Sequence, residues 1–193
     1  FIIMKDLLSI VSHFQLQGTV QEINPLGAGL INDTYKVSTL EADAPDYVLQ
    51  RINHAIFQNV EMLQANINAV TTHIRKKLEE KGEKDIERKV LHFFPADTGK
   101  TYWHDGESYW RVMAFIPNAR TYETVNPEYS YYAGVAFGNF QAMLADIPDK
   151  LGETIPDFHN MEFRLKQLRD AVAADAAGRV KAVSYTHLRA HET

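Results

Sequence analysis

The chain changes from strand-like to helical sequence near residue 117, and this change limits the folds open to it. Before it, runs rich in β-branched and aromatic residues alternate with turn signals such as Pro45 and Asp105-Gly106. The predicted strands are 20–26, 33–39, 47–52, 89–95 and 108–116. Strands followed by helices are typical of α+β proteins, in which sheet and helices occupy separate regions. We therefore expect an α+β fold with two lobes.

One long helical segment interrupts these strands. Its apolar residues recur at steps of three and four, which places them on one face of a helix. They are Val60, Leu63, Ile67, Val70, Ile74 and Leu78. Further helices are predicted for 6–14, for the segment that begins at Asn126-Pro127, and for 161–177 after Asn160. Asparagine is a favoured N-cap and proline a favoured first helical residue, so both later helices have a clear start.

Composition excludes several classes of protein. The net charge of −5 argues against a nucleic-acid partner, which normally requires a basic face. The absence of cysteine excludes disulfides, a thiolate nucleophile and a cysteine-based zinc site. No apolar run has the length of a membrane span. We expect a cytoplasmic protein that binds neither nucleic acid nor membrane.

Both ends of the chain carry sequence that is foreign to the fold. Phe1 is not an initiator, and Met4 is the start that we expect. Residues 183–193 share neither the periodicity nor the composition of the preceding helix, and they match an in-frame translation of a transposase-type sequencing adapter. We interpret 183–193 as such an artefact and exclude it from the fold. The spacing of His187 and His191 is therefore not taken as a metal site.

A glycine-containing loop joins the first two predicted strands. Gly27, Ala28 and Gly29 follow the first strand, and Asn32 and Thr34 lead into the second. Glycines tolerate positive φ and carry no side chain, so successive backbone amides can approach a polyphosphate. Asn32 and Thr34 could add polar contacts. A plain hairpin turn explains the same residues, and spacing alone leaves both interpretations open.

The order of these elements resembles the aminoglycoside phosphotransferase and choline kinase superfamily of small-molecule kinases. Three motifs are most similar to bacterial N-acetylhexosamine 1-kinases: Leu30-Ile-Asn-Asp-Thr-Tyr-Lys-Val37, Tyr47-Val-Leu-Gln-Arg-Ile-Asn53 and Ile155-Pro-Asp-Phe-His159. The resemblance covers residues 4–182. It implies a protein-kinase-like fold that uses ATP and Mg²⁺. Residues 1–117 are then a nucleotide-binding small lobe, with a five-stranded antiparallel sheet and a helix, and 118–182 are the hinge and a truncated helical lobe.

The resemblance also implies which residues contact the nucleotide phosphates. Kinases hold them with a cation on the third strand, and Arg51 is the basic residue of 47–52. Arg51 lies two positions after Leu49, so both point to one face of the sheet. On the long helix, Glu61 is predicted to face solvent, whereas Asn66 lies nearer the apolar stripe and is the preferred polar contact. The alternative for Arg51 is an ordinary surface position.

The last predicted strand resembles a kinase hinge. In this interpretation Met113 closes the adenine pocket, and the Ala114 carbonyl and the Ile116 amide bind the adenine edge. A buried strand that ends in a proline turn is the alternative. Phe158, His159 and Arg164 are predicted to contact the acceptor, although a helix capped by Asn160 explains the same segment.

The catalytic groups of this family are absent from residues 120–182. In this family a His-x-Asp loop supplies the aspartate that acts as the base. The same loop and a later Asp-x-Asp segment supply the magnesium ligands. Neither pattern occurs in residues 120–182. His104-Asp105-Gly106 is instead predicted to be a hairpin turn. We expect part of an ATP-dependent kinase that phosphorylates the anomeric hydroxyl of an N-acetylhexosamine, with no turnover by this chain alone. Aminoglycoside or choline/ethanolamine acceptors, and a catalytically silent nucleotide-binding protein, are the alternatives.

Overall fold

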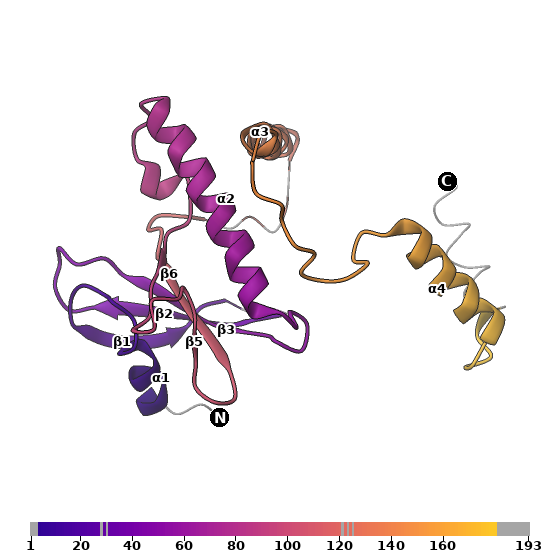
Figure 1. The fold of residues 1–193 in the computed structure, drawn as a ribbon, viewed down its shortest axis with the longest axis horizontal. Coiled ribbons are helices and arrows are strands. Elements are labelled where there is room, and N and C mark those ends of the chain that lie inside the picture. Colours follow the sequence, from indigo (N-terminus) through magenta and orange to yellow (C-terminus); the bar gives the residue numbers. More distant parts are fainter. Residues whose placement is uncertain are drawn as a thin grey trace. The chain divides into compact units, whose positions relative to one another are not determined.

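The computed structural model describes residues 4–27, 29, 31–120, 122, 124 and 126–180, with the side chains of Met4 and Lys5 excepted (Figure 1). The chain divides into two compact units, Phe1–Thr154 and Ile155–Thr193. The predicted artefact at 183–193 and the predicted loop residue Ala28 lie outside the described residues.

An antiparallel sheet forms the centre of the first unit. In spatial order its strands are β1 (Val20–Pro25), β2 (Asp33–Thr39), β3 (Tyr47–Ile52), β6 (Tyr109–Ala114) and β4 (Phe93–Phe94), and β5 (Trp103–His104) also pairs with β6. The predictions for β1, β2, β3 and β6 are confirmed to within two residues at each end. The α+β class is confirmed as well.

The described sheet has six strands where the sequence predicted five. The additional strand, β5, forms because Asp105 closes a tight hairpin to β6: its carboxylate accepts the amides of Glu107 at 2.8 Å and Ser108 at 2.6 Å. This confirms that Asp105 is a turn residue. The predicted strand 89–95 is reduced to Phe93–Phe94, because a 3₁₀ helix, η1 (Ile86–Arg88), precedes it and Val90 packs against helix α2.

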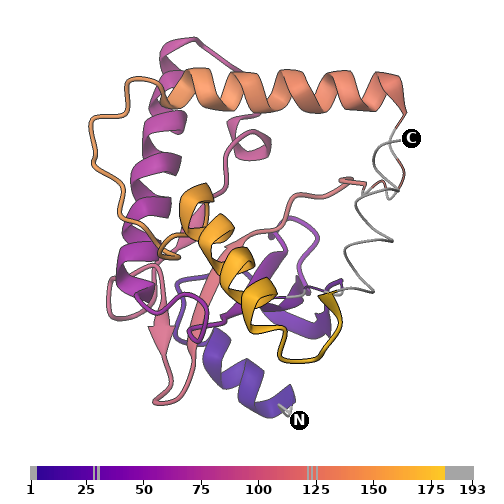
Figure 2. The same ribbon diagram turned by 90° about the vertical axis from the view of Figure 1, so that its right-hand side faces the viewer.

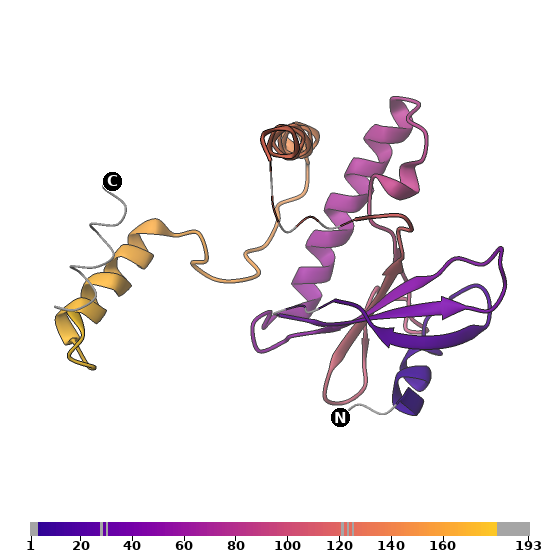
Figure 3. The ribbon, with the colours of Figure 1, turned by 180° about the vertical axis from the view of Figure 1, so that it is seen from behind.

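Two helices cover opposite faces of this sheet (Figure 3). Helix α1 (Met4–Val11) packs on the face that carries an apolar core. The strand residues at the centre of this core are fully buried: Val37, Tyr47, Leu49 and Val112. Burying one such side chain contributes about 1.5–3 kcal/mol. The α1 face is therefore the main source of stability of this unit.

Helix α2 (Val60–Glu80) covers the other face. Its N-cap Asn59 accepts the Met62 amide at 2.8 Å. The apolar stripe is confirmed in position, with Val60, Ile74 and Leu78 buried. At the C-terminal end of α2, a second small core also involves residues of helix α3.

Helix α3 (Pro127–Leu144) begins as predicted, with Asn126 accepting the Tyr129 amide at 2.8 Å. Its C-terminal end lies beside α2 (Figure 2), where the Lys77 ammonium donates to the Met143 carbonyl at 2.9 Å. The first compact unit includes this helix, and the lobe boundary at 117/118 stays a prediction. No residue of α3 is fully buried.

The second unit contains helix α4 (Met161–Ala174). Asn160 caps it by accepting the Phe163 amide at 3.1 Å, as predicted. The helix ends three residues before the predicted 177, because Asp175 adopts a left-handed conformation with φ +36°. No described helix combines the length and apolarity that crossing a bilayer requires.

Candidate functional site

A half-buried arginine is held between two glutamines on the α2 face of the sheet. Arg111 of β6 donates to the Gln50 Oε1 of β3 from Nε at 3.0 Å and from Nη2 at 2.6 Å. Its Nη1 donates to the Gln64 Oε1 of α2 at 3.0 Å. Burial lowers the pKa of Arg111 to about 10, so the guanidinium remains positively charged at neutral pH.

Strand register and helix periodicity bring these three residues together. Gln50 and Arg111 are direct cross-strand partners, and their side chains therefore lie on the same face of the sheet. Gln64 lies on the apolar stripe of α2, four residues after Val60 and three before Ile67, and is only 2% exposed. The Gln64 amide nitrogen donates to the Thr101 carbonyl at 2.7 Å, so this polar side chain is satisfied at both ends.

A pocket of about 610 Å³ opens beside this network, between the sheet, α2 and the end of α3. Its walls are largely apolar, with Arg111, Gln50 and Asn66 among the polar groups. The apolar residues that line it are Ile67, Val70, Ile74, Val90, Leu91, Phe93, Met113, Phe140 and Met143. Two of the residues predicted from sequence, Asn66 and Met113, therefore share one pocket.

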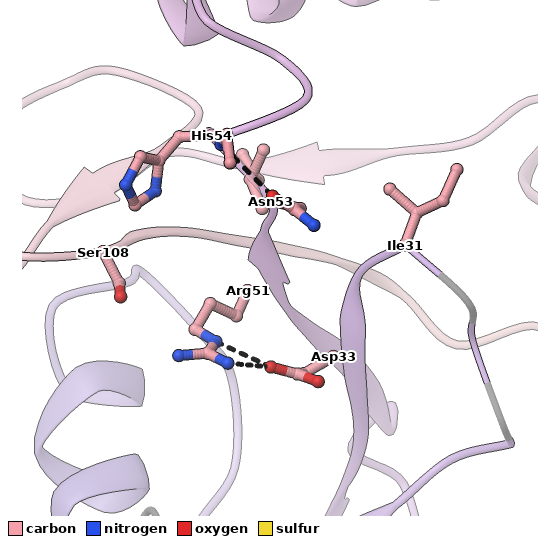
Figure 4. Close-up of a pocket in the computed structure, with 8 residues that line it drawn as sticks. Ile31, Asp33, Arg51, Asn53, His54 and Ser108 are labelled. Atoms are coloured by element: carbon pink, nitrogen blue, oxygen red, sulfur yellow. Dashed lines mark hydrogen bonds and ion pairs between the residues drawn. The ribbon is translucent and has the colours of Figure 1, made fainter. Parts of the chain in front are cut away.

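Arg51 lies on the opposite face. It points to the same side as Leu49, as predicted, but that side is the one covered by α1. Its guanidinium forms an ion pair with Asp33 of β2, with Nε 2.7 Å from Oδ2 (Figure 4). The pair lines a smaller pocket of about 270 Å³ with Ile31, His54 and others. Of these two pockets, formed by described residues, Arg51 lines the smaller and Met113 the larger.

The glycine loop has geometry that favours glycine at two described positions. Gly27 has φ +73°. A Cβ on Gly29 would lie 2.7 Å from the Asn32 carbonyl oxygen, closer than real Cβ atoms come. The Asn32 side chain accepts the Asn53 amide at 2.9 Å and ties the loop to the end of β3. Thr34 accepts a bond from Gln50 at 3.0 Å and so adjoins the Arg111 network.

The predicted hinge leaves the sheet at Ala114. The Ala114 amide donates to the His92 carbonyl at 2.9 Å, and the Phe115 amide donates to the Asp46 carbonyl at 3.1 Å. Ile116 follows in an irregular segment. Backbone hydrogen bonds to His92 on one side and to Asp46 on the other therefore fix the hinge segment where it leaves β6.

The two candidates on α2 have clear partners. Asn66 exchanges two hydrogen bonds with the backbone of Gly152, at 2.7 and 2.9 Å, and so fixes the segment that follows α3. Glu61 is exposed, as predicted, and pairs with Lys100 at 3.0 Å. The polar residue of α2 that faces the sheet is thus Gln64.

The predicted acceptor residues lie in the second unit and make local contacts. Phe158 is exposed and its ring contacts that of His159, with centroids 4.7 Å apart. Arg164 donates to Gln167 at 2.9 Å. Their role toward an acceptor stays a prediction.

Sequence reasoning missed Gln50, Gln64 and Arg111. A signal for Gln64 was present, because it is a polar residue within the apolar stripe. Arg111 also stands between Trp110 and Val112 in the middle of a predicted strand, where a charge is unusual. Within the described ranges, no group of three or more histidine or acidic side chains could hold a metal ion, so no Mg²⁺ site is assigned.

Comparison with known proteins assigns the chain to a family. Residues 22–190 match the model of the phosphotransferase enzyme family. A solved structure of a spectinomycin phosphotransferase, in complex with ADP and spectinomycin, is similar with 10% identity and a TM-score of 0.47. That similarity covers 76% of this chain and 38% of the spectinomycin phosphotransferase, so the chain spans well under half the length of that protein. Since the family model matches most of its residues, the chain belongs to the phosphotransferase enzyme family.

Proposed function

We propose that this chain forms the nucleotide-binding part of an ATP-dependent kinase that phosphorylates a hydroxyl group of a small molecule. The nucleotide occupies the pocket between the sheet and α2. The observation that carries this proposal is that Met113 and Asn66, selected from separate parts of the sequence, line that same pocket.

The size and chemistry of the pocket fit a nucleotide. Ligand pockets typically enclose about 300–1,000 Å³ and combine apolar walls with a few polar groups, and this one has about 610 Å³. Met113 and Phe93 offer an apolar surface for a purine, while the adjoining Ala114 and Ile116 offer backbone groups to its edge. Gly27 and Gly29 begin the loop that we assign to the phosphates.

The preferred acceptor is an N-acetylhexosamine, phosphorylated at its anomeric hydroxyl. The motifs at Leu30–Val37, Tyr47–Asn53 and Ile155–His159 support this choice through their resemblance to bacterial N-acetylhexosamine 1-kinases. An aminoglycoside or an amino alcohol such as choline is the second candidate, favoured by membership of the phosphotransferase family. The catalytic aspartate and the magnesium ligands are expected from a His-x-Asp loop and an Asp-x-Asp segment, which residues 120–182 do not contain.

Two measurements test this proposal. Calorimetric titration of the 193-residue chain with ATP should show binding, and Met113→Trp, which fills the pocket, should abolish it. Leu40→Trp, at an exposed position outside the pocket, is the matched control. Absence of ATP binding by the unmodified chain would refute the nucleotide site.

The acceptor is tested by mass-spectrometric detection of phosphorylated products. This chain alone should form none, whereas a protein that joins it to the two catalytic segments should phosphorylate N-acetylhexosamines at the anomeric position. Preference for an aminoglycoside or choline would replace the sugar assignment. Nucleotide binding by the joined protein without any product would identify a catalytically silent relative.

A further inference from the structure

We propose that Arg111 of β6, rather than the arginine on β3, supplies the positive charge that binds the nucleotide phosphates. The inference rests on the nucleotide site proposed above. It assigns to β6, the fourth strand in spatial order, a task that the resemblance had assigned to Arg51 on β3.

Other cations near this part of the sheet already have a carboxylate partner. Arg51 pairs with Asp33, Lys36 with Asp46 at 2.8 Å, and Lys89 with Glu83 at 2.6 Å. Their positive charges are therefore largely compensated within the protein. A phosphate would have to compete with those carboxylates for each of them.

Arg111 differs because its partners are neutral. The three hydrogen bonds that its guanidinium donates all end on the amide oxygens of Gln50 and Gln64. None of the ion pairs among the described residues involves Arg111. A half-buried cation whose hydrogen bonds end on neutral amides is a favourable site for an anion, since the anion restores electrostatic energy lost on partial burial.

The geometry leaves room for that anion. A guanidinium has five N–H donors in a planar fork, and Arg111 uses three of them within the described structure, which leaves two for a ligand. Arg111 is one of the residues that line the 610 Å³ pocket. The Thr34 hydroxyl accepts a hydrogen bond from the Gln50 amide at 3.0 Å, and the Thr101 carbonyl accepts one from the Gln64 amide at 2.7 Å. Because both glutamines are fixed in this way, the guanidinium is oriented before a ligand binds.

A purely structural role explains this arrangement less well. Where a polar network only links elements, apolar residues of similar size are often equally or more stabilising. Burial also lowers the pKa of Arg111 toward about 10, which indicates that the protein alone does not compensate the charge.

The test compares ATP with adenosine, which lacks the phosphates, by calorimetric titration of the full 193-residue chain. Arg111→Met should weaken ATP binding roughly 10–100-fold, as expected for a lost charged hydrogen bond, and leave adenosine binding unchanged. Arg111→Lys should retain part of the ATP affinity, because it keeps the charge but loses the fork. Lys100→Met removes one exposed positive charge and is the matched control, with no change for either ligand.

Three outcomes would overturn the proposal. One is unchanged ATP affinity in both Arg111 variants, and another is an equal loss of ATP and adenosine affinity, which would mean that Arg111 only maintains the pocket. The third is a selective loss of ATP binding in Arg51→Met but not in Arg111→Met. Circular dichroism identifies a variant that does not fold, in which case the better-folded of the two Arg111 variants decides. Failure of the unmodified chain to bind ATP would instead refute the nucleotide site itself.

Discussion

The two faces of one sheet differ in almost every respect, although they are built from alternate residues of the same strands. On the α1 face, Leu49 and Val112 are fully buried in an apolar core. On the α2 face, the neighbouring Gln50 and Arg111 form a polar network beside a pocket. The difference teaches that the α1 face supplies stability, which leaves the α2 face able to keep a half-buried charge and an open volume for binding.

The largest effect is expected from truncation on the α1 face. Leu49→Ala should lower the free energy of unfolding by about 2–5 kcal/mol, because it leaves a cavity in a fully buried core. The control is Val48→Ala, at the half-buried neighbour that points to the other face, which should cost less. Urea denaturation measures both, and equal losses would contradict the assignment of stability to the α1 face.

A smaller effect is expected where α2 meets the polar face. Gln64→Ala should cost about 2–3 kcal/mol, since it leaves the Nη1 of the half-buried Arg111 without its partner. Thr72→Ala, at an exposed position of the same helix, is the control and should change little. If both substitutions left the denaturation midpoint unaltered, the network would have no structural importance.

The glycine loop should respond next. Gly29→Ala places a methyl group against the Asn32 carbonyl, so we expect a loss of about 1–2 kcal/mol in stability and weaker ATP binding. Gly99→Ala introduces strain at φ +76° in a turn with open space around it, and should not affect ATP binding. Titration with ATP distinguishes the two, and unchanged affinity in Gly29→Ala would argue for a plain hairpin.

The Lys36–Asp46 pair should give a pH-dependent effect. A hydrogen bond from Lys36 lowers the pKa of the Asp46 carboxyl below its ordinary value of 3.8. The carboxylate therefore stabilises the folded chain above pH 3.8, and this stabilisation is lost as the pH falls through the lowered folded-state pKa. Asp46→Asn should cost about 1 kcal/mol at neutral pH.

Below the folded-state pKa of Asp46 the difference between Asp46→Asn and the unmodified chain should shrink. Denaturation curves at neutral pH and well below pH 3.8 provide the comparison. A difference that stayed constant across this range would exclude a contribution from the ionised carboxylate.

The smallest effect is expected for Glu61. Its side chain is exposed and paired only with Lys100, so Glu61→Gln should change stability by less than about 0.5 kcal/mol and leave ATP affinity unaltered. Thermal denaturation and ATP titration together check this. A marked loss of affinity would show that Glu61 takes part in nucleotide binding.

Much of the fold was predictable because it depends on local sequence. The strands around Val37, Leu49 and Val112 follow from alternating apolar residues, and helix α3 follows from its Asn126 cap. Strand β5 was missed because two residues carry too little pattern, and it depends on pairing with β6. In the candidate site, Met113 and Asn66 were predicted, whereas the half-buried Arg111 was not.

By itself, the sequence determined that Arg51 points to the same side as Leu49, since side chains alternate along any strand. It also determined which residues of α2 form the apolar stripe, and that glycines stand at the start of the first loop. Only the tertiary structure decided which face of the sheet each helix covers, because that choice depends on contacts between residues far apart in the chain. Those contacts place Arg51 on the face of α1 and bring Gln50, Gln64 and Arg111 together on the face of α2.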